Sequence, residues 1–241
     1  MNLKEEFSKF RLVKEDEKYI YVKGTRGVPK IVKISKVLTH DMYFLAGVIL
    51  GDGHLKKDKT RISIELTDKE KLQSINKMFE LTFGLQSIRI HPIRDKRENR
   101  KLRFLSYIDS APIYHLFHEI FQIPRGKKSH KIFVPKFVFN APLTIKKYFL
   151  LGVFITDGGK RSGINSKGLS TASLEFRDGI SRLLRDVLII DKHDQWLNKK
   201  YRKVYYGLYF HKKYIKNMRG FQSGQMDQIL EYLTDKLEGQ A

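Results

Sequence analysis

The stretch YFLAGVILGDG at residues 43–53 recurs as YFLLGVFITDG at residues 148–158. Seven of the eleven aligned positions are identical, and the shared Asp52 and Asp157 are 105 positions apart. Each copy is followed by a short alternating segment and an amphipathic helical pattern, and then by a basic segment with the alternation of a hairpin. An internal repeat of this kind predicts that the chain consists of two copies of one folding unit.

Both copies of the repeated stretch have the pattern of a buried helix. Almost every residue is apolar, and a helix that is apolar on all sides has to be enclosed by protein. Gly47 and Gly51 are four positions apart and share one helix face, which Gly152 and Thr156 match in the second copy. Small residues on one face let two helix backbones approach closely. We therefore expect the two helices to pack on each other through these positions, around a pseudo-twofold axis.

Each helix is expected to end at an Asp-Gly pair. Gly53 and Gly158 can adopt the left-handed conformation that commonly ends a helix. Asp52 and Asp157 would then lie side by side at the negative ends of two helix dipoles, where their charges are unfavourable. A divalent cation that prefers oxygen ligands, Mg²⁺ or Ca²⁺, would offset these charges. The alternative is that each aspartate simply ends its helix, because Asp-Gly is a common turn pair.

The charge of the chain indicates its partner. Its 47 Lys and Arg against 26 Asp and Glu give a formal net charge of +21. Basic residues outnumber acidic ones by 31 to 16 in residues 1–149 and by 16 to 10 in residues 150–241, so the charge is not confined to one tail. Such a distribution is typical of nucleic-acid-binding proteins.

Other features of the composition exclude several protein classes. The chain has no cysteine, so disulfides and thiolate metal sites are excluded. No apolar run is long enough to span a bilayer, and the first residues, MNLKEEFSKF, lack the apolar region of a signal peptide. A cytoplasmic protein without membrane contact is the expectation.

The stretches LAGVILGDG at 45–53 and LLGVFITDG at 150–158 resemble the two copies of the signature of the LAGLIDADG homing endonucleases, in their monomeric two-repeat form. The resemblance implies an α+β fold, a pseudo-twofold duplicate of αββαββα-type repeats with two antiparallel saddle sheets and two central packed helices. It divides the chain into a basic extension with a β-hairpin, a first repeat and a second repeat, at residues 1–40, 41–140 and 141–241.

The resemblance also implies an activity. In that family the chain would be a site-specific double-stranded DNA endonuclease that hydrolyses phosphodiester bonds within a long asymmetric site, with Mg²⁺ as cofactor. Asp52 and Asp157 would be the catalytic acids and would bind the metal together with the residues that precede them, Gly51 and Thr156. Lys160 stands where some relatives carry a basic residue beside the cleavage centre, and would be a third catalytic residue.

The family match places the DNA-reading surface on strands near residues 61–67, 86–108, 169–177 and 193–211. The basic residues expected to contact DNA there are Arg61, Arg89, Arg94, Lys96, Arg97, Arg100, Lys101, Arg103, Arg177, Lys199, Lys200, Arg202 and Lys203.

Two alternatives to a free-standing endonuclease remain open. A non-cleaving RNA maturase or DNA-binding regulator could share the fold, and its partners could then include intron RNA. Two crowded carboxylates give a pure binder no advantage, which argues against this alternative. The chain could also be the endonuclease portion of an intein, but it begins Met-Asn and ends LEGQA, without splicing residues. An intron-encoded monomer is therefore expected.

Overall fold

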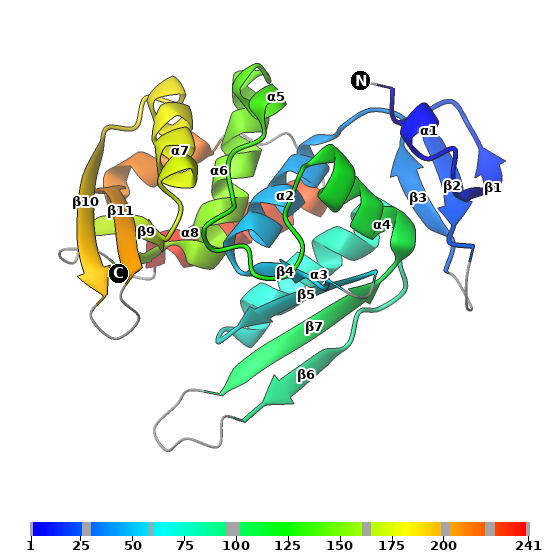
Figure 1. Cartoon of the computed structure of the whole chain (residues 1–241), viewed down its shortest axis with the longest axis horizontal. Coiled ribbons are helices and arrows are strands. Elements are labelled where there is room, and N and C mark those ends of the chain that lie inside the picture. The colour runs from blue at the N-terminus through cyan, green and yellow to red at the C-terminus, as the bar shows by residue number, and fades with distance from the viewer. Residues whose placement is uncertain are drawn as a thin grey trace.

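Two apolar helices lie side by side at the centre of the molecule (Figure 1). They are α2 (His40–Gly51) and α6 (Leu143–Asp157), and they hold the two copies of the repeated stretch. In α2 every residue from Met42 to Gly51 is buried. No helix in the described part of the chain is both long and apolar enough to cross a membrane. The structure is a computed structural model, and it describes residues 2–25, 30–57, 60–94, 102–160, 165–198, 203–219 and 225–239.

A similar succession of elements follows each central helix. In the first repeat it comprises β4 (Gly53–Leu55), β5 (Arg61–Leu66), α3 (Lys69–Phe83), β6 (Ile90–Ile93), β7 (Arg103–Asp109), α4 (Ala111–His115) and the π-helix η1 (Leu116–Ile120). The short helix α5 (Lys136–Phe139) precedes the second repeat. That repeat comprises β8 (Gly159–Lys160), β9 (Ser166–Thr171), α7 (Leu174–Asp186), β10 (Asp191–Asn198), β11 (Lys203–His211), the 3-10 helix η2 (Lys212–Met218) and α8 (Gln225–Gly239).

Each repeat forms one four-stranded antiparallel sheet. The strand orders are β4-β5-β7-β6 and β10-β11-β9-β8. Alternate residues of the strands point into the core, as the buried Ile62 and Ile64 of β5 and Leu208 of β11 show. We call the opposite side of each sheet, which carries the residues between these, its outer face. The α+β fold class with two antiparallel sheets and a duplicated repeat is thus confirmed.

The second repeat departs from the predicted strand near residues 169–177. Strand β9 ends at Thr171, and helix α7 begins three residues later. The side chain of Ser173 accepts a hydrogen bond from the backbone N–H of Phe176 at 3.2 Å, which makes Ser173 the N-cap of α7. The strand prediction is therefore wrong beyond Thr171, because a capping serine starts a helix there.

A separate small sheet precedes the first repeat. It follows the short helix α1 (Leu3–Glu6) and consists of three antiparallel strands, β1 (Arg11–Glu15), β2 (Tyr19–Lys23) and β3 (Val32–Ser35). Strands β2 and β3 form the hairpin expected in residues 1–40, and β1 adds a third strand. One side of this sheet is buried in the core of the molecule through Ile20, Val22, Val32 and Ile34.

Candidate functional site at the end of the central helices

The two central helices touch backbone to backbone. A Cβ atom on Gly47 would overlap the carbonyl oxygen of Phe149, and one on Gly51 would overlap the hydroxyl group of Thr156. A Cβ atom on Gly152 would likewise overlap the backbone of α2. These contacts advance along both helices in the same direction, so the helices are parallel and their C-terminal ends lie together.

Asp52 and Asp157 lie at these adjacent ends. Asp52 is the C-cap of α2, and Asp157 is the last residue of α6. Strand β4 follows Asp52 directly, and β8 follows Asp157 after one residue, Gly158. The arrangement brings one carboxylate from each repeat to the same end of the helix pair.

The glycines after the two aspartates do not take the expected left-handed conformation. Gly158 has φ −71° and ψ 112°, and Gly53 is not among the described glycines with positive φ. Their small size is needed for another reason, because the strand returns tightly over the helix. A Cβ atom on Gly53 would lie 2.5 Å from the Cα of Ile49, and one on Gly158 would overlap the carbonyl oxygen of Phe154.

Both carboxyl groups have a raised pKa. Loss of hydration is the larger cause for Asp52, and the negative charge of Asp157 adds to it. Loss of hydration also raises the pKa of Asp157. The surface of Asp52 is exposed and that of Asp157 half-buried, so the surrounding protein removes hydration while leaving one side open. Such an open pair of crowded carboxyl groups favours binding of a cation.

Lys128 closes the end of α2. Its Nζ donates hydrogen bonds to the carbonyl oxygens of Ile49, Leu50 and Gly51 at 2.5, 2.7 and 2.5 Å. The last carbonyls of a helix have no partner within the helix, and a cation there also opposes the helix dipole. Burial lowers the pKa of Lys128 to about 8, while the charges of Asp157 and Asp52 oppose this change.

The oxygen atoms at the site fit a divalent ion of the Mg²⁺ or Ca²⁺ class. The two carboxylates are donors of the kind these ions prefer, and Mg²⁺ commonly keeps several waters beside one or two carboxylates. Among the described residues no group of three or more acidic or histidine side chains forms a complete metal site. The other two predicted metal ligands, Gly51 and Thr156, already have hydrogen-bond partners in the protein. The Gly51 carbonyl accepts a hydrogen bond from Lys128, and the Thr156 hydroxyl donates to the carbonyls of Gly152 and Val153.

The outer face of the first sheet carries two of the basic residues predicted to bind DNA. Arg61 forms a bidentate pair with Asp109, at 2.6 and 2.9 Å, and its guanidinium lies 4.6 Å from the centre of the Tyr107 ring. Arg103 forms an ion pair with Glu65. These pairs join neighbouring strands β5 and β7, so they hold both arginines in place on the sheet.

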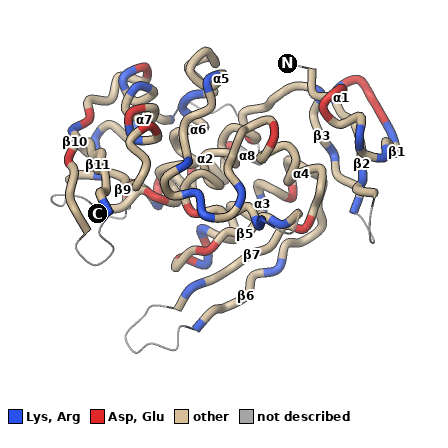
Figure 2. The backbone as a smooth tube through the Cα atoms, in the orientation of Figure 1, with Lys and Arg blue, Asp and Glu red and all other residues tan. Residues whose placement is uncertain are grey.

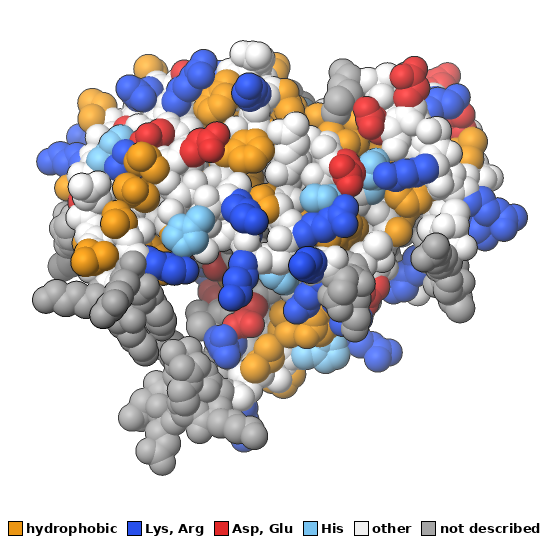
Figure 3. Space-filling model, viewed as in Figure 1, with side chains coloured by type: hydrophobic (Ala, Val, Ile, Leu, Met, Phe, Trp, Pro, Cys, Tyr) orange, Lys and Arg blue, Asp and Glu red, His pale blue; other side chains and the backbone are white. Residues whose placement is uncertain are grey.

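Further basic and aromatic residues flank β6 of the first sheet or lie on the second sheet. Arg89, Arg94 and Lys203 are exposed, and Trp196 on β10 stacks on Tyr205 of β11 at a centroid distance of 6.0 Å. Figure 2 shows Lys and Arg on both four-stranded sheets and on the N-terminal sheet. In the space-filling view of Figure 3, basic side chains spread across the middle of the visible face toward the N-terminal sheet.

Comparison with protein families agrees with this geometry. The model of the LAGLIDADG-like domain matches the chain twice, at residues 39–120 and 144–220, which is more than half of its length. The chain belongs to the LAGLIDADG-like family. Each match begins within one residue of the start of a central helix, so the family's two repeats coincide with the two structural repeats.

Curated relatives of this LAGLIDADG chain are much longer proteins. The chain is 28% identical over 216 residues to a probable translation initiation factor IF-2 of Methanocaldococcus jannaschii, a match that covers 85% of the chain and 17% of that protein. It is 28% identical over 146 residues to elongation factor 2 of Methanopyrus kandleri, which covers 60% of the chain and 10% of that protein. The chain thus spans a small part of each relative.

Solved structures share the fold. The homing endonuclease I-DmoI, in a complex with DNA and Ca, has a TM-score of 0.53 at 13% identity, covering 80% of this chain and 97% of that one. The homing endonuclease I-WcaI, bound to its DNA recognition sequence, has a TM-score of 0.50 at 18% identity, covering 80% and 87%. At these identities the likeness concerns the fold.

The remaining sequence-predicted residues of this LAGLIDADG chain divide into three groups. Lys160 lies in β8 with its backbone paired to Lys167, and its side chain is outside the described part of the structure. Arg177 lies on α7 rather than on a strand, paired with Asp178 and 5.5 Å from the ring of Tyr206, so its predicted place on the sheet is wrong. Outside the described residues are Lys96, Arg97, Arg100, Lys101, Lys199, Lys200 and Arg202.

Sequence reasoning missed Lys128. It is separated by 77 positions from Gly51, whose carbonyl it binds, and no local pattern indicates such a partner. The only signal is its position in the basic stretch RGKK at residues 125–128, which is also typical of a solvated turn.

Proposed function

We propose that this chain is a site-specific DNA endonuclease that cuts both strands of a duplex with Mg²⁺. The observation that carries the proposal is the meeting of Asp52 and Asp157 at the shared end of two parallel helices, one acid from each repeat. A protein that only binds DNA gains no stability from two crowded carboxyl groups whose pKa values are raised by their surroundings.

The residues of the site have separate tasks in this proposal. Asp52 and Asp157 would hold the divalent ion, which when bound supplies activation of water and charge stabilisation at the phosphate. Lys128 fixes the end of α2 and adds positive charge beside both carboxylates. Lys160 follows Asp157 by three residues and is proposed as a further basic group of the site.

Double-stranded DNA is the proposed partner because the charge and the fold both favour it. The net charge of +21 suits a polyanion, and Arg61 and Arg103 are held in place on the outer face of the first sheet. Two related sheets can contact two halves of one duplex site. Because the repeats differ in sequence, the recognised site is proposed to be asymmetric. The neighbours I-DmoI and I-WcaI, both homing endonucleases with DNA-bound structures, support this proposal.

The genetic setting of the chain also bears on its function, because similar segments occur in longer proteins. The expectation of an intron-encoded protein stays a prediction. Curated relatives with unrelated names contain a similar segment that makes up only 10% to 17% of their length. This distribution supports an element that is inserted into host genes, including protein-coding sequence, rather than a domain required by each host protein.

Cleavage of a duplex library tests the proposal. The chain is incubated with the library in Mg²⁺, and parallel incubations contain Ca²⁺ or EDTA. The library includes the sequence that flanks the gene's own insertion point with the intervening element removed. Discrete Mg²⁺-dependent double-strand cuts at one site are expected. Tight, salt-dependent binding without a cut under any condition would contradict the proposal and leave a DNA-binding protein.

A further inference from the structure

We propose that the N-terminal sheet is a third DNA-binding surface, which grips phosphates of the duplex beyond the outer edge of the first repeat. This inference rests on the proposed function and extends it, because it assigns the extra sheet a part of the DNA site. The family match begins at residue 39, so it leaves this sheet without a role.

Strand register separates the charges of the N-terminal sheet onto two sides. Residues opposite each other share a side, and the pairs Arg11–Lys23, Lys14–Tyr21 and Tyr21–Lys33 therefore lie on the side away from the core. We call this side the N-terminal basic face; its members are Arg11, Lys14, Tyr19, Tyr21, Lys23 and Lys33.

Two acidic residues, Glu15 and Asp16, lie near this face. Glu15 pairs in register with the buried Ile20, so it lies on the opposite side, where it forms ion pairs with Lys4 at 3.0 Å and Lys36 at 2.7 Å. Asp16 lies in the turn after β1 and accepts hydrogen bonds from the backbone N–H groups of Lys18 and Tyr19. Its carboxylate also interacts with the hydroxyl of Tyr21 and with the charge of Lys14 on the basic face. With four basic residues against the single carboxylate of Asp16, the basic face keeps a net positive charge.

Tyrosines support the basic groups of this face. The Nζ of Lys14 lies 5.4 Å from the ring centre of Tyr21, and the Nζ of Lys33 lies 4.8 Å from that of Tyr19. Aromatic faces attract cations and restrict their movement, so less freedom is lost when a phosphate binds. Alternating lysine and tyrosine side chains of this kind suit a nucleic-acid backbone.

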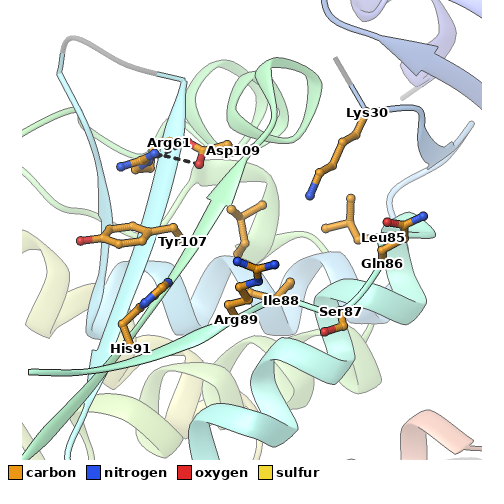
Figure 4. A pocket seen from close by; sticks show the side chains of 11 residues that line it. Lys30, Arg61, Leu85, Gln86, Ser87, Ile88, Arg89, His91, Tyr107 and Asp109 are labelled. Carbon is orange, nitrogen blue, oxygen red and sulfur yellow. Dashed lines mark hydrogen bonds and ion pairs between the residues drawn. The ribbon is translucent and has the colours of Figure 1, made fainter. Parts of the chain in front are cut away.

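The basic face contacts helix α3 of the first repeat. Lys33 donates a hydrogen bond at 3.2 Å to the carbonyl of Leu81, near the end of α3. A hollow of about 430 Å³ lies between the N-terminal segment and the first sheet. It is lined by Lys30 and Arg89 and by Arg61, His91 and Tyr107 of the first sheet. Figure 4 shows Lys30 reaching toward the hollow from the N-terminal segment, across from Arg61, Tyr107 and His91.

The N-terminal sheet packs firmly against the rest of the molecule and is not attached through the chain alone. Its buried side packs into the core, and the ring of Phe7 makes an edge contact with His115 of α4 at 5.4 Å. The Nε2 of His115 also lies 3.0 Å from the carbonyl oxygen of Glu6. A positive surface held rigidly beside the outer face of the first sheet lengthens the surface that one duplex can follow.

Salt-dependent binding tests the inference. The probe is the duplex recovered from the cleavage selection, either full length or truncated on the side of the first repeat, and binding is measured in Ca²⁺. The variant Lys14→Gln/Lys23→Gln is compared with Lys136→Gln/Arg185→Gln, which removes the same charge from exposed positions on α5 and α7. On the full duplex the first variant should lower the slope of log affinity against log salt by about 2, since each phosphate contact contributes about 0.9.

The controls decide between local contact and total charge. Lys14→Arg/Lys23→Arg should keep the wild-type slope, and melting temperatures confirm that each variant is folded. On the truncated duplex the wild type and the Gln variant should bind alike. An unchanged slope, an equal loss in the α5/α7 variant, or a loss that persists on the truncated duplex would overturn the inference. If the wild type cuts its site while one of these results appears, only this inference fails; a chain that cuts no duplex overturns both.

Discussion

At the residue scale, the repeated motif identified the aspartate pair, whereas the lysine beside it had no sequence signal. Asp52 and Asp157 could be predicted because each repeat carries its own copy of the same aspartate at the same motif position. Lys128 could not be predicted, since its bonds to α2 depend on a loop that returns from a distant part of the chain. Lys128 shows that the negative end of a helix dipole can be neutralised by a residue from outside the motif.

The raised pKa values of the two aspartates predict an unusual dependence of stability on pH. The folded state binds protons more tightly than the unfolded state at these groups, so without metal the free energy of unfolding should fall as pH rises from about 4 through the raised pKa values. Asp52→Asn should remove part of this loss and raise Tm at neutral pH, by about 2–4 °C for each kcal/mol recovered.

Thermal melting in EDTA across that pH range measures the effect. The exposed Glu231→Gln on α8 is the control and should leave the pH profile unchanged. Adding Mg²⁺ should stabilise the wild type more at neutral than at acidic pH, because the ion requires ionised carboxylates. A Tm for Asp52→Asn that is lower than the wild-type value at neutral pH in EDTA would contradict this account of the pair.

Lys128 can be tested against its neighbour in the chain. Lys128→Met keeps most of the side chain but leaves three carbonyls of α2 without their donor, which should cost about 1–3 kcal/mol. Lys127→Met changes an exposed residue and should alter stability by less than about 0.5 kcal/mol. Urea unfolding of both variants gives the comparison. Equal losses in the two would show that the bonds to α2 do not stabilise the fold.

At the element scale, the central claim is the close crossing of α2 and α6. Gly47→Ala places a methyl group against the carbonyl of Phe149, so the helices must separate, and the cost should be about 1–3 kcal/mol. Gly239→Ala, at the end of α8, meets nothing within 4 Å and serves as the control. Equilibrium unfolding in urea measures both. A Gly47→Ala protein as stable as the wild type would contradict the backbone contact.

Some elements could be predicted from the sequence pattern and others could not. An all-apolar helix with spaced glycines has few other places to lie than the centre of the fold, so α2 and α6 were predictable. The extent of β9 was not, because the alternation after Thr171 gives way to a helix capped by Ser173. The left-handed prediction for Gly53 and Gly158 was wrong because a tight return of the strand also requires glycine.

At the scale of the whole molecule, the net charge of +21 opposes compaction in the absence of DNA. Salt screens this repulsion over about 10 Å at 0.1 M. The Tm of the free protein should therefore rise between low and physiological NaCl, while affinity for duplex DNA should fall over the same range. Differential scanning calorimetry and equilibrium binding measure the two trends. A Tm that falls with NaCl would show that net repulsion does not limit stability.

Cleavage of each DNA strand by single-acid variants tests the central claim most directly. Each strand of the selected duplex is labelled separately, and Asp52→Asn and Asp157→Asn are compared with the wild type in Mg²⁺, with binding measured in Ca²⁺. Each variant should bind the site but lose double-strand cleavage by about two to three powers of ten, because a metal contributes several kcal/mol at the transition state. Wild-type cleavage of both strands by both variants would contradict the account, and the aspartates would then only end their helices.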